Sequence, residues 1–249
     1  MRNISFPALL KYALLLFICL GASAALAQPL LDQPTIEDSN LRLGEVLEYN
    51  AKIKGISAGS QTLKINGKKL LKGHEVYHVE SISKTKKFFS VFYRFDNRSQ
   101  SFIHSSYFHP LRYEKSIKDG GYVGNTAVDF DTTNQVARIL KNNKLTELSV
   151  PTGTQDELSI IYLLRTKEIE VGQSYDFPAL IGTEALEASV SVLRTETLNT
   201  DFGKLRTLVV KTIPRGFTIW LTKDRARIPV KMEASTKLGK LVFDLEEIH

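Results

Sequence analysis

One segment, from Thr154 to Arg165, reads as a helix in a chain whose other ordered segments read as strands. Thr154 and Glu157 have the Thr-x-x-Glu spacing of a capping box, which predicts that the helix starts at Thr154. Asp156 and Glu157 then lie near its positive end and Arg165 near its negative end, as the helix dipole favours. The apolar residues that surround its axis are Leu158, Ile160, Ile161, Leu163 and Leu164. Such a helix needs cover on most sides, so we expect a sheet to curve around it.

Alternating apolar and polar residues predict strands on both sides of this helix. The first strand is predicted between Leu47 and Ile53, where every second residue is apolar. Asn66-Gly67 and Lys72-Gly73 are alternative turns for a following hairpin, and the sequence leaves the choice open. Further strands are predicted at 76–83, 122–130, 135–140, 187–196, 204–213, 217–222, 227–235 and 240–246. The predicted fold is mainly β, a strongly curved antiparallel sheet or incomplete β-barrel wrapped around one central helix at about residues 154–165.

The first 27 residues have the pattern of a secretory signal peptide. Arg2 and Lys11 precede an apolar run that ends at Leu20, and Ala25-Leu26-Ala27 fits a cleavage site. We therefore expect cleavage between Ala27 and Gln28 and a periplasmic location. The apolar run is too short for a transmembrane helix and no second run follows, so we expect a soluble mature chain with no integral membrane span.

Cys19 is the only cysteine, and it lies within the signal peptide. It follows Ile18, whereas a lipoprotein signal has a small residue at that position, so lipidation is not expected. The mature chain, residues 28–249, then has no disulfide or thiolate metal site, and we expect one β-rich domain held by a hydrophobic core. Without Arg2 and Lys11 its net charge is +4. This mild excess does not indicate nucleic-acid binding, and attraction to anionic lipid would be a more natural use of it.

Aromatic residues are concentrated between Phe88 and Tyr113, directly after Lys84, Lys86 and Lys87. Aromatic side chains beside lysines are typical of a membrane-facing lip or of the lining of an apolar pocket, and also of ordinary core packing. We expect some of them to border an apolar cavity beside the helix. The residues expected at that cavity are Phe88, Phe89, Phe92, Tyr93, Tyr162 and Trp220.

The motif Gly55-x-Ser57-x-Gly59 matches the pattern of a hydrolase nucleophile elbow, which requires a helix after the serine. Here a strand is predicted to follow, so we interpret the motif as a tight turn and keep a serine hydrolase as the weakest alternative. His74 and His78 would not form a close pair on a strand, so no metal site is predicted. The sequence assigns no catalytic, cofactor-binding or metal-binding residues, and we expect no enzymatic activity.

Asp224, Arg225 and Arg227 form the strongest polar candidate for recognition of a partner or ligand. The alternative interpretation is a structural turn held by the Asp224 carboxylate, because Asp often accepts hydrogen bonds from the backbone two or three residues further on. The sequence favours the turn.

Several short motifs along the chain occur together in a known family. They are Gly55-Ile56-Ser57-Ala58-Gly59, Asp156-Glu157-Leu158-Ser159, Tyr162-Leu163-Leu164-Arg165, Val171-Gly172, Phe202-Gly203, the run 219–224 from Ile219 to Asp224, and Arg227-Ile228-Pro229-Val230. On these motifs the chain resembles the exported bacterial family catalogued as domain of unknown function 3108. The resemblance implies a periplasmic, β-rich protein and carries over no catalytic residues.

The sequence as a whole favours a non-enzymatic periplasmic binding protein that carries or senses an apolar, lipid-like ligand in envelope maintenance. The alternative is a structural or partner-binding envelope protein with a filled core, in which the aromatic side chains only pack. Neither hypothesis requires a cofactor or nucleic acid.

Overall fold

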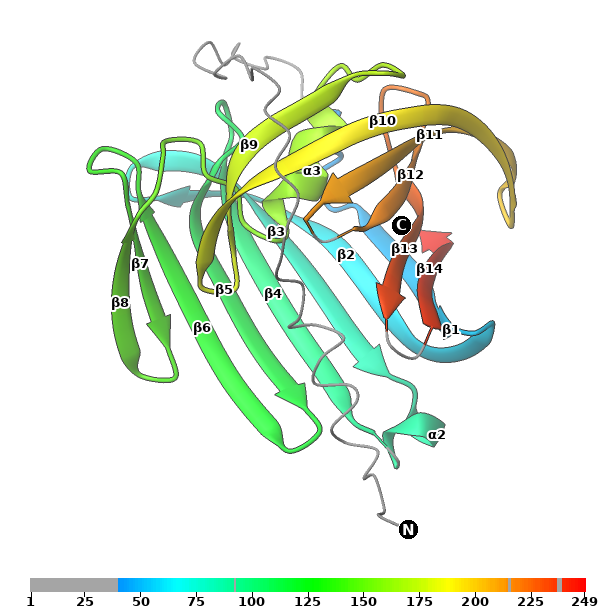
Figure 1. Cartoon of the computed structure of the whole chain (residues 1–249), viewed down its shortest axis with the longest axis horizontal. Coiled ribbons are helices and arrows are strands. Elements are labelled where there is room, and N and C mark those ends of the chain that lie inside the picture. Colours follow the sequence, from blue (N-terminus) through cyan, green and yellow to red (C-terminus); the bar gives the residue numbers. More distant parts are fainter. Residues whose placement is uncertain (1–39, 92, 215, 237–238) are drawn as a thin grey trace.

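The structure is a computed structural model that describes residues 40–91, 93–214, 216–236 and 239–249. Within these residues the chain forms one 14-stranded antiparallel sheet and two short helices, α2 (Lys87–Ser90) and α3 (Ser159–Thr166) (Figure 1). The predicted mainly β, antiparallel fold is confirmed. The strands before α3 are β1 (Val46–Ile53), β2 (Ile56–Leu71), β3 (His74–Thr85), β4 (Phe95–His104), β5 (Pro110–Asp119), β6 (Tyr122–Asp131), β7 (Val136–Lys141) and β8 (Lys144–Ser149). The strands after it are β9 (Ser174–Ile181), β10 (Glu184–Thr200), β11 (Gly203–Ile213), β12 (Thr218–Thr222), β13 (Pro229–Thr236) and β14 (Gly239–Ile248).

The sheet consists of two meanders that meet at its centre. Strands β1 to β8 follow one another in space, as do β9 to β14, and β1 pairs with β14. Strands β8 and β9 are therefore the two edges, and the sheet is open. Neither of the described helices is long and apolar enough to cross a membrane. The predicted signal peptide lies outside the described residues.

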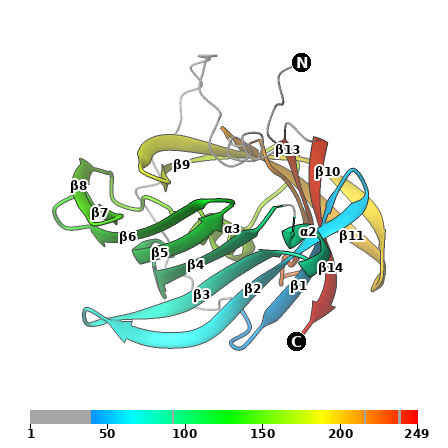
Figure 2. The same ribbon diagram turned by 90° about the horizontal axis from the view of Figure 1, so that it is seen from below.

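The two meanders lie on opposite sides of α3. Figure 2 shows α3 between β9 and β4. Glu157, just before the helix, accepts a hydrogen bond from Lys115 Nζ on β5 at 2.7 Å and another from the backbone N–H of Gly182, after β9, at 2.9 Å. One side chain therefore connects the two halves of the sheet.

The hairpin between β2 and β3 resolves the choice between the two predicted turns. Lys72 and Gly73 form the turn and both have positive φ, 52° and 85°, as a two-residue primed turn requires. Asn66 and Gly67 lie inside β2, where the register with β3 shifts between Ile65 and Gly67. The second motif is thus a bulge in a long strand and not a hairpin.

The helix begins later than the sequence predicted, and the predicted capping box is wrong. The backbone of Gln155 is paired with β9, because its N–H donates to Pro178 O and its carbonyl accepts from Leu180 N, both at 2.8 Å. The chain is therefore extended at this position and cannot yet be helical. The α3 N-terminus is instead held by Asp156, whose Oδ1 accepts from the N–H groups of Leu158 and Ser159 at 2.8 and 2.7 Å.

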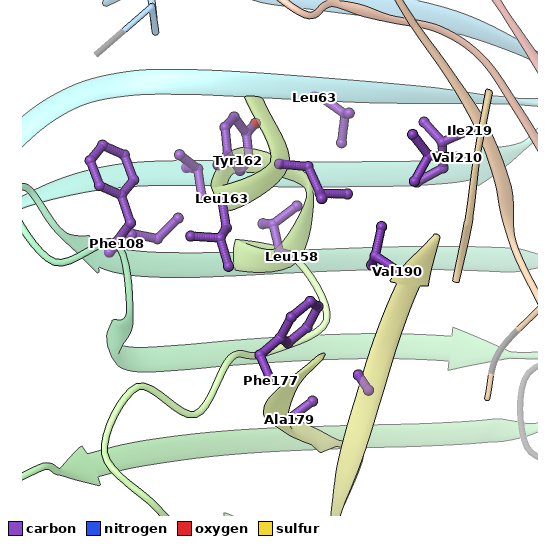
Figure 3. Close-up of a cluster of buried hydrophobic side chains, with 14 of the residues drawn as sticks. Leu63, Phe108, Leu158, Tyr162, Leu163, Phe177, Ala179, Val190, Val210 and Ile219 are labelled. Carbon is purple, nitrogen blue, oxygen red and sulfur yellow. The ribbon is translucent and has the colours of Figure 1, made fainter. Parts of the chain in front are cut away.

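One face of α3 packs into the main hydrophobic core. Tyr162, Leu163 and Leu164 are buried there among residues of both meanders. In Figure 3, Phe177 of β9 lies below Leu158, and Phe108 lies to the left of Leu163 and Tyr162. Ile160 and Ile161 are only partly buried, because they face a cavity.

Candidate functional site

A partly open cavity of about 780 Å³ lies beside α3, between the two meanders. This volume falls within the range of about 300 to 1,000 Å³ that is typical of sites for small ligands. Leu158, Ile160 and Ile161 from the helix segment form one boundary of the cavity. The expected space beside the helix is therefore present, and its remaining walls come from the sheet.

The wall formed by the second meander is mostly apolar. All strands from β9 to β14 contribute side chains to it, and β10 does so only near its start, at residues 186–190. Alternate residues of a strand point to the same face of the sheet, so the contributing side chains lie together. The apolar residues of this wall are Phe177, Ile181, Leu186, Ala188, Val190, Ile213, Phe217, Ile219, Met232, Ala234, Leu241 and Phe243.

The wall formed by the first meander is mixed, with uncharged polar side chains beside apolar ones such as Ile53, Phe89 and Phe95. Gln61, Ser83 and Asn97 are cross-strand neighbours on β2, β3 and β4, so they share one face. Ser81 and Ser99 form the next row on β3 and β4. The cavity therefore has one apolar wall and a second, mixed wall that supplies most of its hydrogen-bonding groups, which we call the polar wall.

Charged groups at the helix end of the cavity neutralise one another. Lys115 Nζ lies 2.7 Å from Glu157 Oε2, and Tyr113 donates its hydroxyl to the same oxygen at 3.2 Å. Burial, followed by the nearby Glu157 carboxylate, raises the pKa of Tyr113 well above its usual value, so this hydroxyl stays protonated. This arrangement fixes the position of the helix segment and leaves no strong charge for an ionic ligand here.

The Tyr93 hydroxyl and Asn97 Oδ1 belong to residues of the cavity wall, and both atoms are buried without a hydrogen-bond partner among the described residues. Leaving such groups unpaired costs free energy, so each would gain from any hydrogen-bonding group that a small side-chain shift brings within reach.

Two of the six residues predicted to border the cavity do so. Phe89 of α2 and Tyr93 lie in its wall. Phe88 does not, because its side chain is exposed on the outside of α2. Phe92 lies outside the described residues.

Tyr162 and Trp220 were also predicted to line the cavity, and the structure places both elsewhere. Tyr162 is buried in the core on the other side of α3, where its hydroxyl donates to Lys64 O at 3.3 Å. Trp220 follows Ile219, which lines the cavity, so its ring points to the opposite face of β12. There Lys231 Nζ lies 4.7 Å from the centre of the indole ring.

The polar cluster of Asp224, Arg225 and Arg227 forms a turn between β12 and β13 and does not contribute to the cavity wall. Asp224 Oδ1 accepts hydrogen bonds from Thr222 Oγ1 at 2.8 Å and from the N–H groups of Ala226 and Arg227 at 3.1 and 3.3 Å. This is the structural role that the sequence favoured. Arg225 is exposed.

Ser57 lies on strand β2, paired with Lys52, and not in a tight turn as predicted. The turn between β1 and β2 is formed by Lys54 and Gly55, the two residues before β2, which both have positive φ. Ser57 Oγ accepts from Lys86 Nζ at 2.5 Å and donates to Asn50 Oδ1. A nucleophile elbow needs a helix after the serine, and Ser57 is instead followed by the rest of the 16-residue strand β2, up to Leu71.

Sequence reasoning missed most of the apolar wall. Leu241 and Phe243 could have been found, because their alternation predicts one shared face of β14. Nothing in the sequence indicated that β9 to β13 would place Phe177 and Met232 opposite the polar wall, since that depends on how the two meanders meet.

One group of side chains in the described part of the chain has the spacing to hold a metal ion. Its members are Glu48, Glu247 and His249, with ligand atoms within 4.8 Å of one another. All three are exposed, and none lines the cavity. Exposed acidic groups of this kind are common, so we assign no function to them.

The comparisons with known proteins agree with the fold. A family model described as "Protein of unknown function (DUF3108)" matches residues 48–246, so the chain belongs to this family. No curated protein gives a significant match.

Among solved structures, the chain is similar to a β-barrel-like protein of domain of unknown function 1849 from Brucella abortus. The two share 13% identity with a TM-score of 0.57, over 83% of this chain and 97% of the other. A DUF1089 family protein from Pseudomonas aeruginosa gives 11% identity and a TM-score of 0.43, over 70% and 89% of the two chains. A putative exported protein from Bacteroides fragilis gives 11% and 0.35, over 84% and 96%. At these identities the likeness is one of fold alone, and of these three structures the first is the one with a TM-score above 0.5.

Proposed function

We propose that this protein is a non-enzymatic binding protein that carries or senses an apolar, lipid-like ligand in the bacterial envelope. In this proposal the open sheet acts as an incomplete barrel around α3 and holds the ligand between its two halves. The observation that carries the proposal is the cavity of about 780 Å³ with one predominantly apolar wall. A barrel interior of this kind is either filled with side chains or available to one small ligand.

The proposed location is the periplasm, after removal of residues 1–27. The basic start, the apolar run and Ala25-Leu26-Ala27 support export. An envelope location would place such a binding protein between two membranes, where an apolar compound needs shelter from water.

The alternative is a structural or partner-binding protein with a filled core. It requires the space beside α3 to be closed by packed side chains. The size of the cavity favours the ligand hypothesis, because protein interiors rarely contain empty spaces much larger than a water molecule.

A fluorescent apolar probe, N-phenyl-1-naphthylamine, tests the proposal directly. Ala234 lines the cavity on β13, and Ala234→Phe would fill part of it. Ala127→Phe on β6 is the matched control, since Ala127 is also half-buried on a strand but is not part of the cavity wall. We expect the probe to bind the wild type and the control equally and to bind Ala234→Phe at least tenfold more weakly.

The binding proposal fails if the probe does not bind, or if both variants bind it as the wild type does. Extraction of the purified protein with organic solvent, followed by mass spectrometry, then identifies any compound retained from the cell.

The serine hydrolase alternative depends on Ser57 and its contact with Lys86. We expect no labelling of Ser57 by a fluorophosphonate probe and no functional change in Ser57→Ala. A covalent adduct on Ser57 that is absent in Ser57→Ala would establish a reactive serine.

A further inference from the structure

The end of the sheet that carries α2 borders the mouth of the cavity. The register of the strands places the β1–β2 turn, the β5–β6 turn and α2 at this end, since Gly59 pairs with Thr85 and Phe95 pairs with Asp119. Gly59, Thr85, Phe95 and Asp119 also line the cavity. We call the segments 54–57, 84–91, 94, 118–123 and 213 the α2 rim, because they surround this opening.

Large apolar side chains are exposed along the α2 rim. Phe88 and Val91 are 74% and 82% exposed at α2, which projects from the sheet in Figure 1. Ile56, Val123 and Ile213 are each more than half exposed. Scattered exposed apolar residues are normal, whereas a group of them around the opening of an apolar cavity marks an interaction surface.

Positive charges outnumber negative ones around these apolar side chains. None of the ion pairs found in the described residues includes the basic residues of the α2 rim, which are Lys54, Lys84, Lys86, Lys87, Arg94 and Lys118. Two acidic residues lie beside them: Asp96, which pairs in register with Lys84 and Lys118, and the buried Asp119. The α2 rim is therefore strongly basic.

The opposite end of the sheet provides a contrast. Leu70 is 77% exposed at the β2–β3 hairpin and also has lysines around it. There, however, Lys68 Nζ lies 2.7 Å from Glu75 and Lys72 Nζ lies 3.0 Å from Asp129. At the α2 rim, by contrast, none of the six basic residues takes part in an ion pair within the described part of the chain.

We propose that the α2 rim docks on a lipid bilayer that carries anionic headgroups. Phe88 and Val91 enter the interface between headgroups and acyl chains, and the lysines contact phosphate groups around them, as in other interfacial segments. The mouth of the cavity then faces the membrane. This inference depends on the exposed apolar side chains and the charge of the α2 rim, and it does not require the cavity to hold a lipid.

Flotation of the purified protein with vesicles tests this inference. The vesicles are phosphatidylcholine alone or phosphatidylcholine with 30% phosphatidylglycerol, a composition of about one anionic lipid in three. We expect binding to the anionic vesicles, at least fivefold weaker binding to the neutral ones, and loss of binding at high salt, since exposed charges are screened.

Two double variants, each replacing two exposed apolar side chains, separate the α2 rim from non-specific hydrophobic adsorption. Phe88→Ser/Val91→Ser removes apolar groups from the rim, and Leu70→Ser/Leu145→Ser removes exposed groups elsewhere. We expect at least fivefold weaker binding to anionic vesicles for the first and no change for the second, with unchanged circular dichroism for both.

Charge is tested separately by Lys86→Gln/Lys87→Gln, which should weaken binding to anionic vesicles and leave the probe affinity of the cavity unchanged. The inference is overturned if the wild type does not float with anionic vesicles at low salt. It is also overturned if both apolar variants lose binding equally, or if headgroup charge makes no difference. If the α2 rim binds a protein instead of a membrane, the wild type will not float with anionic vesicles at low salt.

Discussion

Arg165 on α3 donates two parallel hydrogen bonds to Glu45, from Nη1 to Oε1 at 2.6 Å and from Nη2 to Oε2 at 2.9 Å. The side chains of Arg165 and Glu45 are 1% and 6% exposed. The Arg165 Nε–H also donates to Ala226 O, at 3.1 Å, in the turn between β12 and β13. One guanidinium therefore joins the helix to the start of the first strand and to the second meander.

Breaking this pair should destabilise the fold strongly. Glu45→Leu or Arg165→Met leaves the other charge buried without its partner, which typically costs about 3 to 5 kcal/mol. The free energy of unfolding from urea titrations measures the cost. In the double variant both charges are gone, so we expect it to be more stable than either single variant.

The exposed pair of Arg194 and Glu196 is the control, with side chains 54% and 33% exposed. Arg194→Met should change the free energy of unfolding by less than about 1 kcal/mol. If Arg165→Met costs no more than Arg194→Met, the buried pair does not hold α3 in place.

Two apolar residues of α3 should respond differently to truncation. Leu163 is buried in the core, so Leu163→Ala should cost about 2 to 5 kcal/mol through lost burial and a new void. Ile161 already faces the cavity, so Ile161→Ala enlarges an existing space and should cost at most about 1.5 kcal/mol. Urea midpoints of the two variants give the comparison.

Equal and large losses at both positions would show that the space beside Ile161 is filled in solution. Equal and small losses, below about 1 kcal/mol, would show that α3 is not enclosed by the sheet.

Local pattern predicted the existence of α3 and most of the strands, but it missed β4, β5, β8 and β9. Alternation between Leu47 and Ile53 placed β1 correctly, because one side of that strand faces the core. The start of α3 was missed by five residues, from Thr154 to Ser159. Thr154 and Glu157 have the spacing of a capping box, but the pairing of Gln155 with Ala179 of β9 keeps the chain extended there. The sequence around Gln155 carries no signal for this pairing, because Ala179 lies far along the chain.

The pH dependence of stability should report on Asp156. Burial raises the pKa of this carboxyl to about 6, from an ordinary value of 3.8, although Ser101 Oγ and two backbone N–H groups favour its charged form. Between these values the folded state retains a proton that the unfolded state releases, so the contribution of Asp156 to stability falls as the pH rises. A difference of this size corresponds to about 3 kcal/mol.

Asp156→Asn removes this titration while keeping an oxygen that can accept from the N-terminus of α3. Relative to the wild type, the variant should therefore become more stable as the pH rises from 4 to 7. The measurement is the difference in the free energy of unfolding at several pH values. A difference that stays constant with pH would mean that Asp156 titrates normally.

The lining of the cavity could be predicted only in small part. The aromatic segment after Lys87 stands out from the local sequence, and two of its residues, Phe89 and Tyr93, lie in the cavity wall. Trp220 was chosen because it is the sole tryptophan, and its position on the outer face of β12 follows only from the strand register. Its fluorescence is consequently a poor reporter of ligand entry, and Phe177→Trp would place an indole in the wall instead.

The unpaired polar atoms of the cavity should contribute to ligand selectivity. Tyr93→Phe removes a hydroxyl that has no hydrogen-bond partner in the structure, so it should leave the free protein as stable as the wild type or slightly more stable. Asn97→Leu likewise removes an unpaired acceptor from the polar wall.

If the ligand is amphiphilic, both changes should weaken binding of a monoacylglycerol by about tenfold, which corresponds to one lost hydrogen bond of about 1.4 kcal/mol. Binding of an alkane of the same chain length should not change, because it contacts only the apolar wall. Competition against N-phenyl-1-naphthylamine measures both affinities. An equal loss for the two ligands would mean that Tyr93 and Asn97 shape the cavity without contacting a headgroup, and the polar wall would then have no role in choosing the ligand.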